Sequence, residues 1–227
     1  MDAGGEAGEE AVMTLPDGYS EEARALWDAA TALNRRAGAV SLPPLLFFTD
    51  PDRTPRPWET AARLPAGAGV VFRAFGAPDA VETGRRLREA TLTADARLLV
   101  GLDPDLAETI GADGLHLPER AADQAEAIRA RRPDWLVTAA WHGAATPLAT
   151  GLDALVLSPV FPAGGASSEK TPLGAADFSQ RVRLAGRPVY ALGGIDAVNA
   201  PRLRDTGACG LAGVEAVQSA FGPPIRI

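Results

Sequence analysis

The sequence predicts an α/β fold in which eight parallel strands close into a compact (β/α)8 TIM barrel, with an extra helix before the first strand. Short apolar runs alternate along the chain with amphipathic segments, which is typical of a parallel sheet covered by helices. About eight such units occupy residues 45–220, and eight units close naturally into a barrel. The main alternative is an open doubly wound sheet, but no G-x-G-x-x-G pattern follows the first apolar run.

The expected elements follow from this alternation. Each expected strand is a short run of mostly apolar residues, and each expected helix carries apolar residues among charged ones. The expected strands are residues 45–48, 69–75, 98–102, 114–117, 136–140, 154–158, 189–192 and 210–214. The helices expected after them are residues 58–64, 79–90, 105–110, 121–131, 144–150, 176–184, 197–205 and 215–220.

The N-terminal region is expected to contain a tail and a helix. Residues 1–18 are small and acidic, which favours a disordered tail. Ser20 followed by two glutamates is typical of a helix start, so we expect a helix over residues 20–37 before the first strand. Residues 19–227 are then expected to form one barrel domain, because a chain of 227 residues suits a single barrel.

Composition excludes several classes of function. The net charge of −7 disfavours binding to nucleic acid or to an anionic membrane. We expect a cytoplasmic protein, because the N-terminus lacks the basic and apolar regions of a secretory signal. Cys209 is the single cysteine, so no internal disulfide or multi-cysteine metal site is expected. We expect no cofactor, and the sequence leaves a homo-oligomer open.

Glycine-rich strand ends indicate a phosphate site. In a barrel, ligands bind at the C-terminal ends of the strands. Gly193 and Gly194 follow the seventh strand, and Gly213 and Val214 end the eighth. Glycine lets the backbone approach a phosphate closely, although these could also be simple turn glycines. Glu215 argues against the site, because a carboxylate repels a phosphate.

Four kinds of side chain at strand ends could take part in chemistry. His142 could transfer a proton near neutral pH or serve only as a hydrogen-bonded residue of the rim. Arg73 could bind a carboxylate or phosphate, or form an internal salt bridge. Polar residues of the loop over residues 163–170 could contact an anion or remain solvated; they are Ser167, Ser168 and Lys170. His116 is expected to pack or hydrogen-bond locally.

Several segments resemble one family. Ile110–Leu117 (IGADGLHL) resembles the IGADGVHL segment of thiamine phosphate synthases and their relatives, the TenI-type thiazole tautomerases. The segments 140–142, 158–174 (SPVFP to PLG), 189–195 and 207–214 agree with it in order and spacing. The chain is identified as a divergent member of this superfamily. The resemblance implies a (β/α)8 barrel that binds a small heteroaromatic phosphate. The synthase joins a thiazole phosphate to a pyrimidine diphosphate with Mg²⁺, and the tautomerase isomerises a thiazole carboxylate phosphate.

Departures from the synthase pattern favour the tautomerase. The synthase motif Q-x-R-x-K appears as Val71, Arg73 and Phe75, so only the arginine remains. The resemblance places the acidic Mg²⁺ ligands at Leu102 and Ala121, which cannot bind a metal. Asp103 and Glu119 lie nearby, but a shift of one residue on a strand turns a side chain to the other face.

The resemblance therefore implies no metal site. It implies metal-independent proton transfer in thiamine metabolism, with His142 moving the proton and Arg73 orienting a carboxylate. Two alternatives stay open. One is a non-catalytic ligand-binding barrel that has lost the synthase residues, and the other is a thiamine phosphate synthase with an unusual site.

Overall fold

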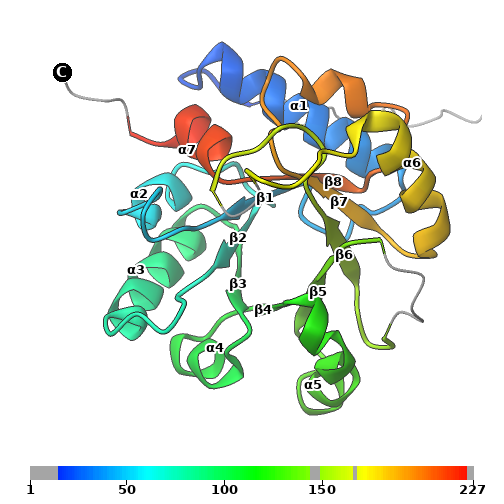
Figure 1. Cartoon of the computed structure of the whole chain (residues 1–227). Coiled ribbons are helices and arrows are strands. Elements are labelled where there is room, and N and C mark those ends of the chain that lie inside the picture. Colours follow the sequence, from blue (N-terminus) through cyan, green and yellow to red (C-terminus); the bar gives the residue numbers. More distant parts are fainter. Residues whose placement is uncertain (1–14, 144–148, 166–167, 224–227) are drawn as a thin grey trace, which may run out of the picture.

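The eight predicted strands form a closed parallel barrel. The computed structural model describes residues 15–143, 149–165 and 168–223. Strands pair in chain order, and the first also pairs with the eighth (Figure 1), which confirms the predicted fold class. The strands are β1 (Leu45–Phe48), β2 (Gly69–Phe72), β3 (Arg97–Gly101), β4 (Gly114–Leu117), β5 (Leu136–Trp141), β6 (Ala154–Leu157), β7 (Val189–Leu192) and β8 (Gly210–Gly213).

Helices surround the barrel (Figure 1). The α-helices are α1 (Glu21–Arg36), α2 (Pro57–Ala61), α3 (Ala80–Thr93), α4 (Pro104–Ile110), α5 (Ala125–Arg131), α6 (Gly174–Ala185) and α7 (Glu215–Phe221). Two 3₁₀ helices are η1 (Glu119–Gln124) and η3 (Ala200–Leu203). In the described part of the chain, none of the helices has the length and apolar character needed to cross a membrane.

Three predicted elements differ most clearly from those observed. The helix predicted over residues 197–205 is only the short η3, because the Asn199 and Asp196 side chains hydrogen-bond local backbone N–H groups instead. The helix predicted over residues 121–131 begins as η1. β2 ends at Phe72, before Phe75, whose φ of 49° is not that of a strand. Most of the helix predicted over residues 144–150 lies outside the described residues.

The barrel interior and the helix-facing layer are filled by alternate strand residues. Leu46, Phe48 and Val71 belong to one buried cluster, together with Tyr190. Their neighbours along the strands belong to a second cluster that also contains helix residues such as Trp27. The first cluster therefore lies inside the barrel. Because side chains alternate along a strand, the same parity aims Arg73 and His116 into the barrel mouth.

The helix α1 lies outside β8, next to α7 and η3 (Figure 1). Ser20 caps it, since its side chain accepts a hydrogen bond from the backbone N–H of Ala23. Leu15 is buried, and its carbonyl accepts a hydrogen bond from Arg24. Leu15 is therefore held against α1, although it lies within the predicted tail of residues 1–18. Residues 1–14 lie outside the described residues.

The buried side chain of Asn34 connects α1 to the barrel. Its amide nitrogen lies 2.9 Å from the carbonyl of Ala39, 3.1 Å from that of Leu42 and 3.1 Å from that of Cys209. Cys209 directly precedes β8. A single side chain therefore satisfies carbonyl groups of both the loop after α1 and the start of β8.

We predict that Asn34→Ala lowers the free energy of unfolding by roughly 2 kcal/mol, because buried carbonyls lose their donor. For a chain of this size the melting temperature should fall by about 4–8 °C. Arg35→Ala, on the exposed side of the same helix, is the matched control and should change little. Equal melting temperatures for Asn34→Ala and the control would contradict the assigned role of Asn34.

Candidate functional site at the mouth of the barrel

A pocket of about 370 Å³ lies at the C-terminal ends of β7 and β8. The structure brings together at this pocket Arg73 and all four residues predicted to hold a phosphate through their backbone. Its lining includes Gly193, Gly194, Gly213, Val214, Arg73, Arg53 and Glu215. This space is called the glycine pocket below.

The glycines after β7 also have a packing role. Gly193 and Gly194 have φ values of 99° and 66°. A Cβ atom at Gly194 would lie 2.2 Å from the carbonyl oxygen of Pro162, and one at Gly193 would lie 2.8 Å from Cα of Pro159. Any larger residue would therefore displace the segment after β6. Both glycines are required for this close approach whether or not a ligand binds.

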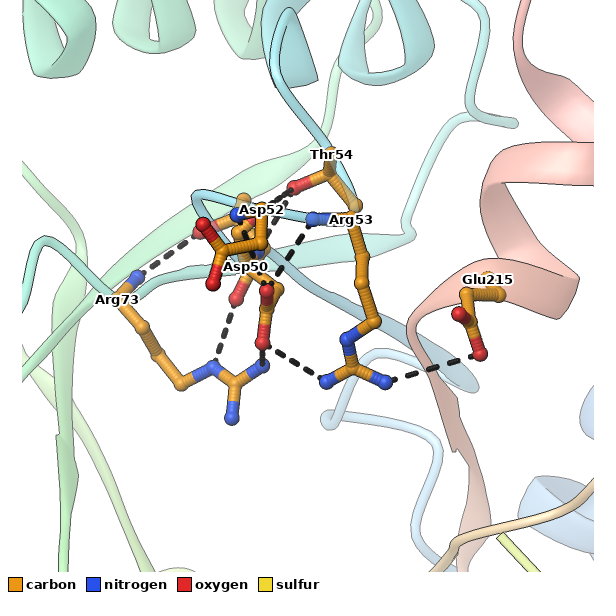
Figure 2. A network of polar contacts seen from close by, with 7 residues as sticks. Asp50, Asp52, Arg53, Thr54, Arg73 and Glu215 are labelled. Carbon is orange, nitrogen blue, oxygen red and sulfur yellow. Dashed lines mark hydrogen bonds and ion pairs between the residues drawn. The ribbon is translucent and has the colours of Figure 1, made fainter. Parts of the chain in front are cut away.

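A network of two arginines and two carboxylates borders the glycine pocket through Arg53, Arg73 and Glu215 (Figure 2). The Asp50 carboxylate accepts hydrogen bonds on one oxygen from Arg53 at 2.8 Å and Arg73 at 3.4 Å. Its other oxygen accepts from the backbone N–H groups of Asp52 and Arg53. The side-chain hydrogen bond from Arg53 is the main cause that holds the pKa of Asp50 below its ordinary value. Asp50 is therefore an ionised anchor for both guanidinium groups.

Arg73 is fixed in position at the barrel mouth. Its Nε donates a hydrogen bond to the carbonyl of Thr49 at 2.7 Å, and its guanidinium lies 5.6 Å from the Phe48 ring and 5.3 Å from the Phe75 ring. Burial lowers the pKa of Arg73, but an arginine remains charged at neutral pH. The predicted internal salt bridge is present with Asp50, and Arg73 also lines the glycine pocket.

Arg53 was not among the residues singled out from the sequence. Arg53 lies in the loop that follows β1, where an arginine three residues after an aspartate is typical of an ordinary surface residue. The signal that could have identified it is its place after β1, since the C-terminal ends of all strands in a parallel barrel face the same mouth. The structure shows that Arg53 borders the glycine pocket and lies 3.7 Å from Glu215.

A second polar cluster lies at the ends of β4 and β5. His142 follows β5, and its Nδ1 lies 2.5 Å from Oε2 of Glu119, which follows β4. The backbone N–H of His142 donates to the other oxygen of Glu119 at 3.0 Å. Lys170 Nζ lies 3.4 Å from His142 Nε2. An ammonium group can only donate, so this contact assigns the lone pair to Nε2 and the proton to Nδ1.

The Glu119 carboxylate is held in its charged form. Burial alone would raise the pKa of Glu119, but hydrogen bonds from His142 and the charge of Lys170 together lower it. A neutral imidazole oriented by an ionised carboxylate can accept a proton at its other nitrogen. The cluster therefore has the chemistry of a general base.

The remaining predicted residues are distributed unevenly. Lys170 contacts His142, and the described lining of the glycine pocket includes neither of them. Ser168 is exposed, and its backbone N–H donates to the carbonyl of Gly165. Ser167 lies outside the described residues. The structure thus separates the predicted site into the glycine pocket with Arg73 and the His142 cluster with Lys170.

The residues at the expected magnesium positions do not fit a Mg²⁺ ion. Leu102 is 40% exposed and Ala121 is buried, and neither offers an oxygen ligand. Nearby, Asp103 caps α4 by accepting a hydrogen bond from the N–H of Leu106, and Glu119 is engaged by His142. Across the described ranges, no three His, Cys, Asp or Glu side chains gather as a metal site would require.

Comparison with known proteins assigns the family. Residues 49–217 match the family described as thiamine monophosphate synthase (TMP-TENI), so the chain belongs to that family. A thiamine-phosphate synthase of Anaeromyxobacter dehalogenans is 32% identical over 202 residues, covering 86% of this chain and 88% of the relative. One from Methanoculleus marisnigri is 32% identical over 164 residues, covering 69% and 78% respectively.

A solved structure agrees with the family assignment. The thiamine phosphate pyrophosphorylase from Pyrococcus furiosus superposes with a TM-score of 0.63 at 26% identity. The match covers 78% of this chain and 91% of that one. The resemblance inferred from the sequence segments is therefore confirmed.

His116 lies inside the barrel beneath the site, and the structure confirms that it packs locally. It is buried, its Nδ1 lies 2.9 Å from the Thr138 hydroxyl, and its ring packs edge-on against Phe48. Burial, followed by the charge of Arg73, lowers the pKa of His116 from 6.5 to about 3. The ring therefore stays neutral at any pH near neutrality.

We predict that His116 makes stability depend on pH. Below its ordinary pKa the unfolded chain binds a proton that the folded chain does not, so stability falls as the pH drops from about 6.5 toward 3. Between pH 7 and pH 5 this group should cost about 2 kcal/mol of unfolding free energy, a loss absent from His116→Gln. The His116 imidazole resonances should also stay constant over that range, and titration near pH 6.5 would contradict the assignment.

Proposed function

We propose that this protein binds a thiazole-type phosphate at the barrel mouth and transfers a proton on it without a metal ion, as a thiazole tautomerase does. One observation carries the proposal: the two acids beside the lost magnesium positions are already engaged. Glu119 is bound by His142, and Asp103 caps α4. Displacement of a diphosphate needs a cation to neutralise the leaving group, whereas proton transfer needs only a base.

Each group then has a defined role. The backbone at Gly193, Gly194, Gly213 and Val214 holds the phosphate, and Arg73 orients a ligand carboxylate. His142 accepts the proton at Nε2 and returns it to another position of the ligand. Glu119 is a positioning residue, because it keeps the proton on Nδ1 and stabilises the imidazolium that forms, as the aspartate of a catalytic triad does.

Lys170 adds a condition for activity. Its ammonium group contacts the same Nε2 atom that would accept the proton. A ligand must therefore draw Lys170 away before His142 can act as a base. An anionic ligand does this directly, because it competes with Nε2 of His142 for the ammonium group. Ser168, which is exposed, lies in the same loop as Lys170.

A second candidate function is thiamine phosphate synthesis with an unusual site. The names of the relatives favour it, because the proteins of Anaeromyxobacter dehalogenans and Methanoculleus marisnigri are both called thiamine-phosphate synthases. It requires the diphosphate to be neutralised by side chains other than the two family carboxylates. The third candidate function is that of a barrel that binds its ligand without turnover. The carboxylate of Glu215 in the lining of the glycine pocket favours it, because it departs from what a phosphate site prefers.

We predict that His142→Ala lowers turnover of a thiazole carboxylate phosphate by roughly 10²- to 10⁴-fold, the usual contribution of a general base. The binding constant should change little, because His142 does not line the glycine pocket. Turnover is measured with a chelator present, alongside calorimetric titration of the same ligand. Full turnover in His142→Ala would contradict the mechanism. Absence of turnover in the unaltered protein would favour a barrel that only binds its ligand.

We predict that Glu119→Gln lowers turnover by at least about tenfold, because the imidazole loses the charge that orients it. The effect should vanish in the His142→Ala background, since the two residues act as a unit. Glu126→Gln is the matched control: Glu126 is exposed and, like Glu119, accepts a hydrogen bond, in its case from Thr150. Additive losses in the double variant would show that Glu119 acts independently of His142.

A further inference from the structure

We infer that Arg53 is an anion-binding residue of the glycine pocket and that Glu215 is an internal competitor for it. The inference rests on the proposed function in one respect: the anion is the phosphate of the ligand. It adds a cation to the site and gives a role to the carboxylate that otherwise argues against phosphate binding.

The two ends of the Arg53 guanidinium have different partners. One nitrogen donates to Asp50 at 2.8 Å, and Asp50 also accepts from the backbone N–H of Arg53. The other nitrogen lies 3.7 Å from Glu215, which is longer than a hydrogen bond (Figure 2). Arg53 is therefore anchored on one side and loosely paired on the side that borders the pocket.

Glu215 is easily displaced from Arg53. Its side chain is 63% exposed, against 23% for Arg53, so it can turn into solvent without being buried elsewhere. An exposed pair of this kind contributes little free energy. A phosphate can offer the guanidinium two short, charge-assisted hydrogen bonds, which are stronger than one long contact. An incoming phosphate can therefore replace Glu215 at Arg53.

The loop after β6 packs over this ion pair. A Cβ atom at Gly165 would lie 2.9 Å from Cζ of Arg53, and one at Gly164 would lie 3.7 Å from the Glu215 carboxylate. Larger residues at Gly165 would push the guanidinium aside. The small residues of this loop thus leave Arg53 room to face the pocket.

Arg53 brings a second positive charge to a site where the resemblance to the synthase motif implies that one is missing. Phe75 occupies the position of the lysine in the synthase motif Q-x-R-x-K, and its ring lies over Arg73 instead of contributing a charge. In the described network, Arg53 and Arg73 balance Asp50 and Glu215. Displacement of Glu215 leaves both guanidinium groups of this network with Asp50 alone as a partner. Asp196, the other acidic residue of the pocket lining, is engaged by the backbone N–H groups of Val198 and Asn199.

Inorganic phosphate is the probe for the test, titrated into the full-length protein and followed by the backbone and arginine Nε resonances in ¹H–¹⁵N NMR spectra. We expect Glu215→Gln to bind phosphate about two- to fivefold more tightly, since it removes an exposed competing charge. Arg53→Met should bind at least about tenfold more weakly. The gain from Glu215→Gln should disappear in the Arg53→Met background.

Glu82→Gln is the matched control, because Glu82 is 60% exposed and pairs with Arg86 on α3. It should leave phosphate affinity unchanged. If Arg53→Met does not fold, Glu215→Gln alone still tests the inference. An unchanged phosphate affinity of Glu215→Gln would overturn the competitor role of Glu215. Equal binding by Arg53→Met and the unaltered protein overturns the role of Arg53 but not the proposed function. If neither the unaltered protein nor Glu215→Gln binds phosphate, both the inference and the proposed function are overturned.

Discussion

Closure of the barrel between β1 and β8 is the constraint on which the site depends. β1 pairs with β2 on one side and with β8 on the other. Because all strands are parallel, the residues that follow these three strands meet at one edge. Asp50 and Arg53 follow β1, Arg73 follows β2 and Glu215 follows β8, so closure itself assembles the network in Figure 2. In an open sheet, Glu215 would be far from Arg53.

The same rule places two separate groups of polar residues around the mouth. The neighbouring strands β4 and β5 bring Glu119 to His142, whereas β7 and β8 form the glycine pocket. A ligand that spans the mouth could place its phosphate among the glycines and its reacting atoms near the imidazole. His116 takes no part in the proposed proton transfer, because its ring is buried beneath this surface and hydrogen-bonded to Thr138.

The barrel could be predicted from the sequence, because apolar runs and amphipathic segments directly follow the pattern of burial in strands and helices. The sequence was insufficient where local hydrogen bonds compete with a helix, as at Asn199, and where an apolar residue such as Leu15 finds a distant contact. The contact between Glu119 and His142 and the position of Arg53 at the pocket arise where neighbouring strands end. These contacts between side chains become evident only in the folded structure.

The most direct test of metal-independent ligand chemistry is calorimetric titration with thiazole phosphate, carried out with added Mg²⁺ and again with a chelator. The account predicts micromolar binding of equal strength in both conditions, because the groups proposed to bind the phosphate are arginines and backbone N–H groups. Binding that appears only with Mg²⁺ would contradict it. Such a result would mean that a metal site forms from ligands other than the two lost carboxylates.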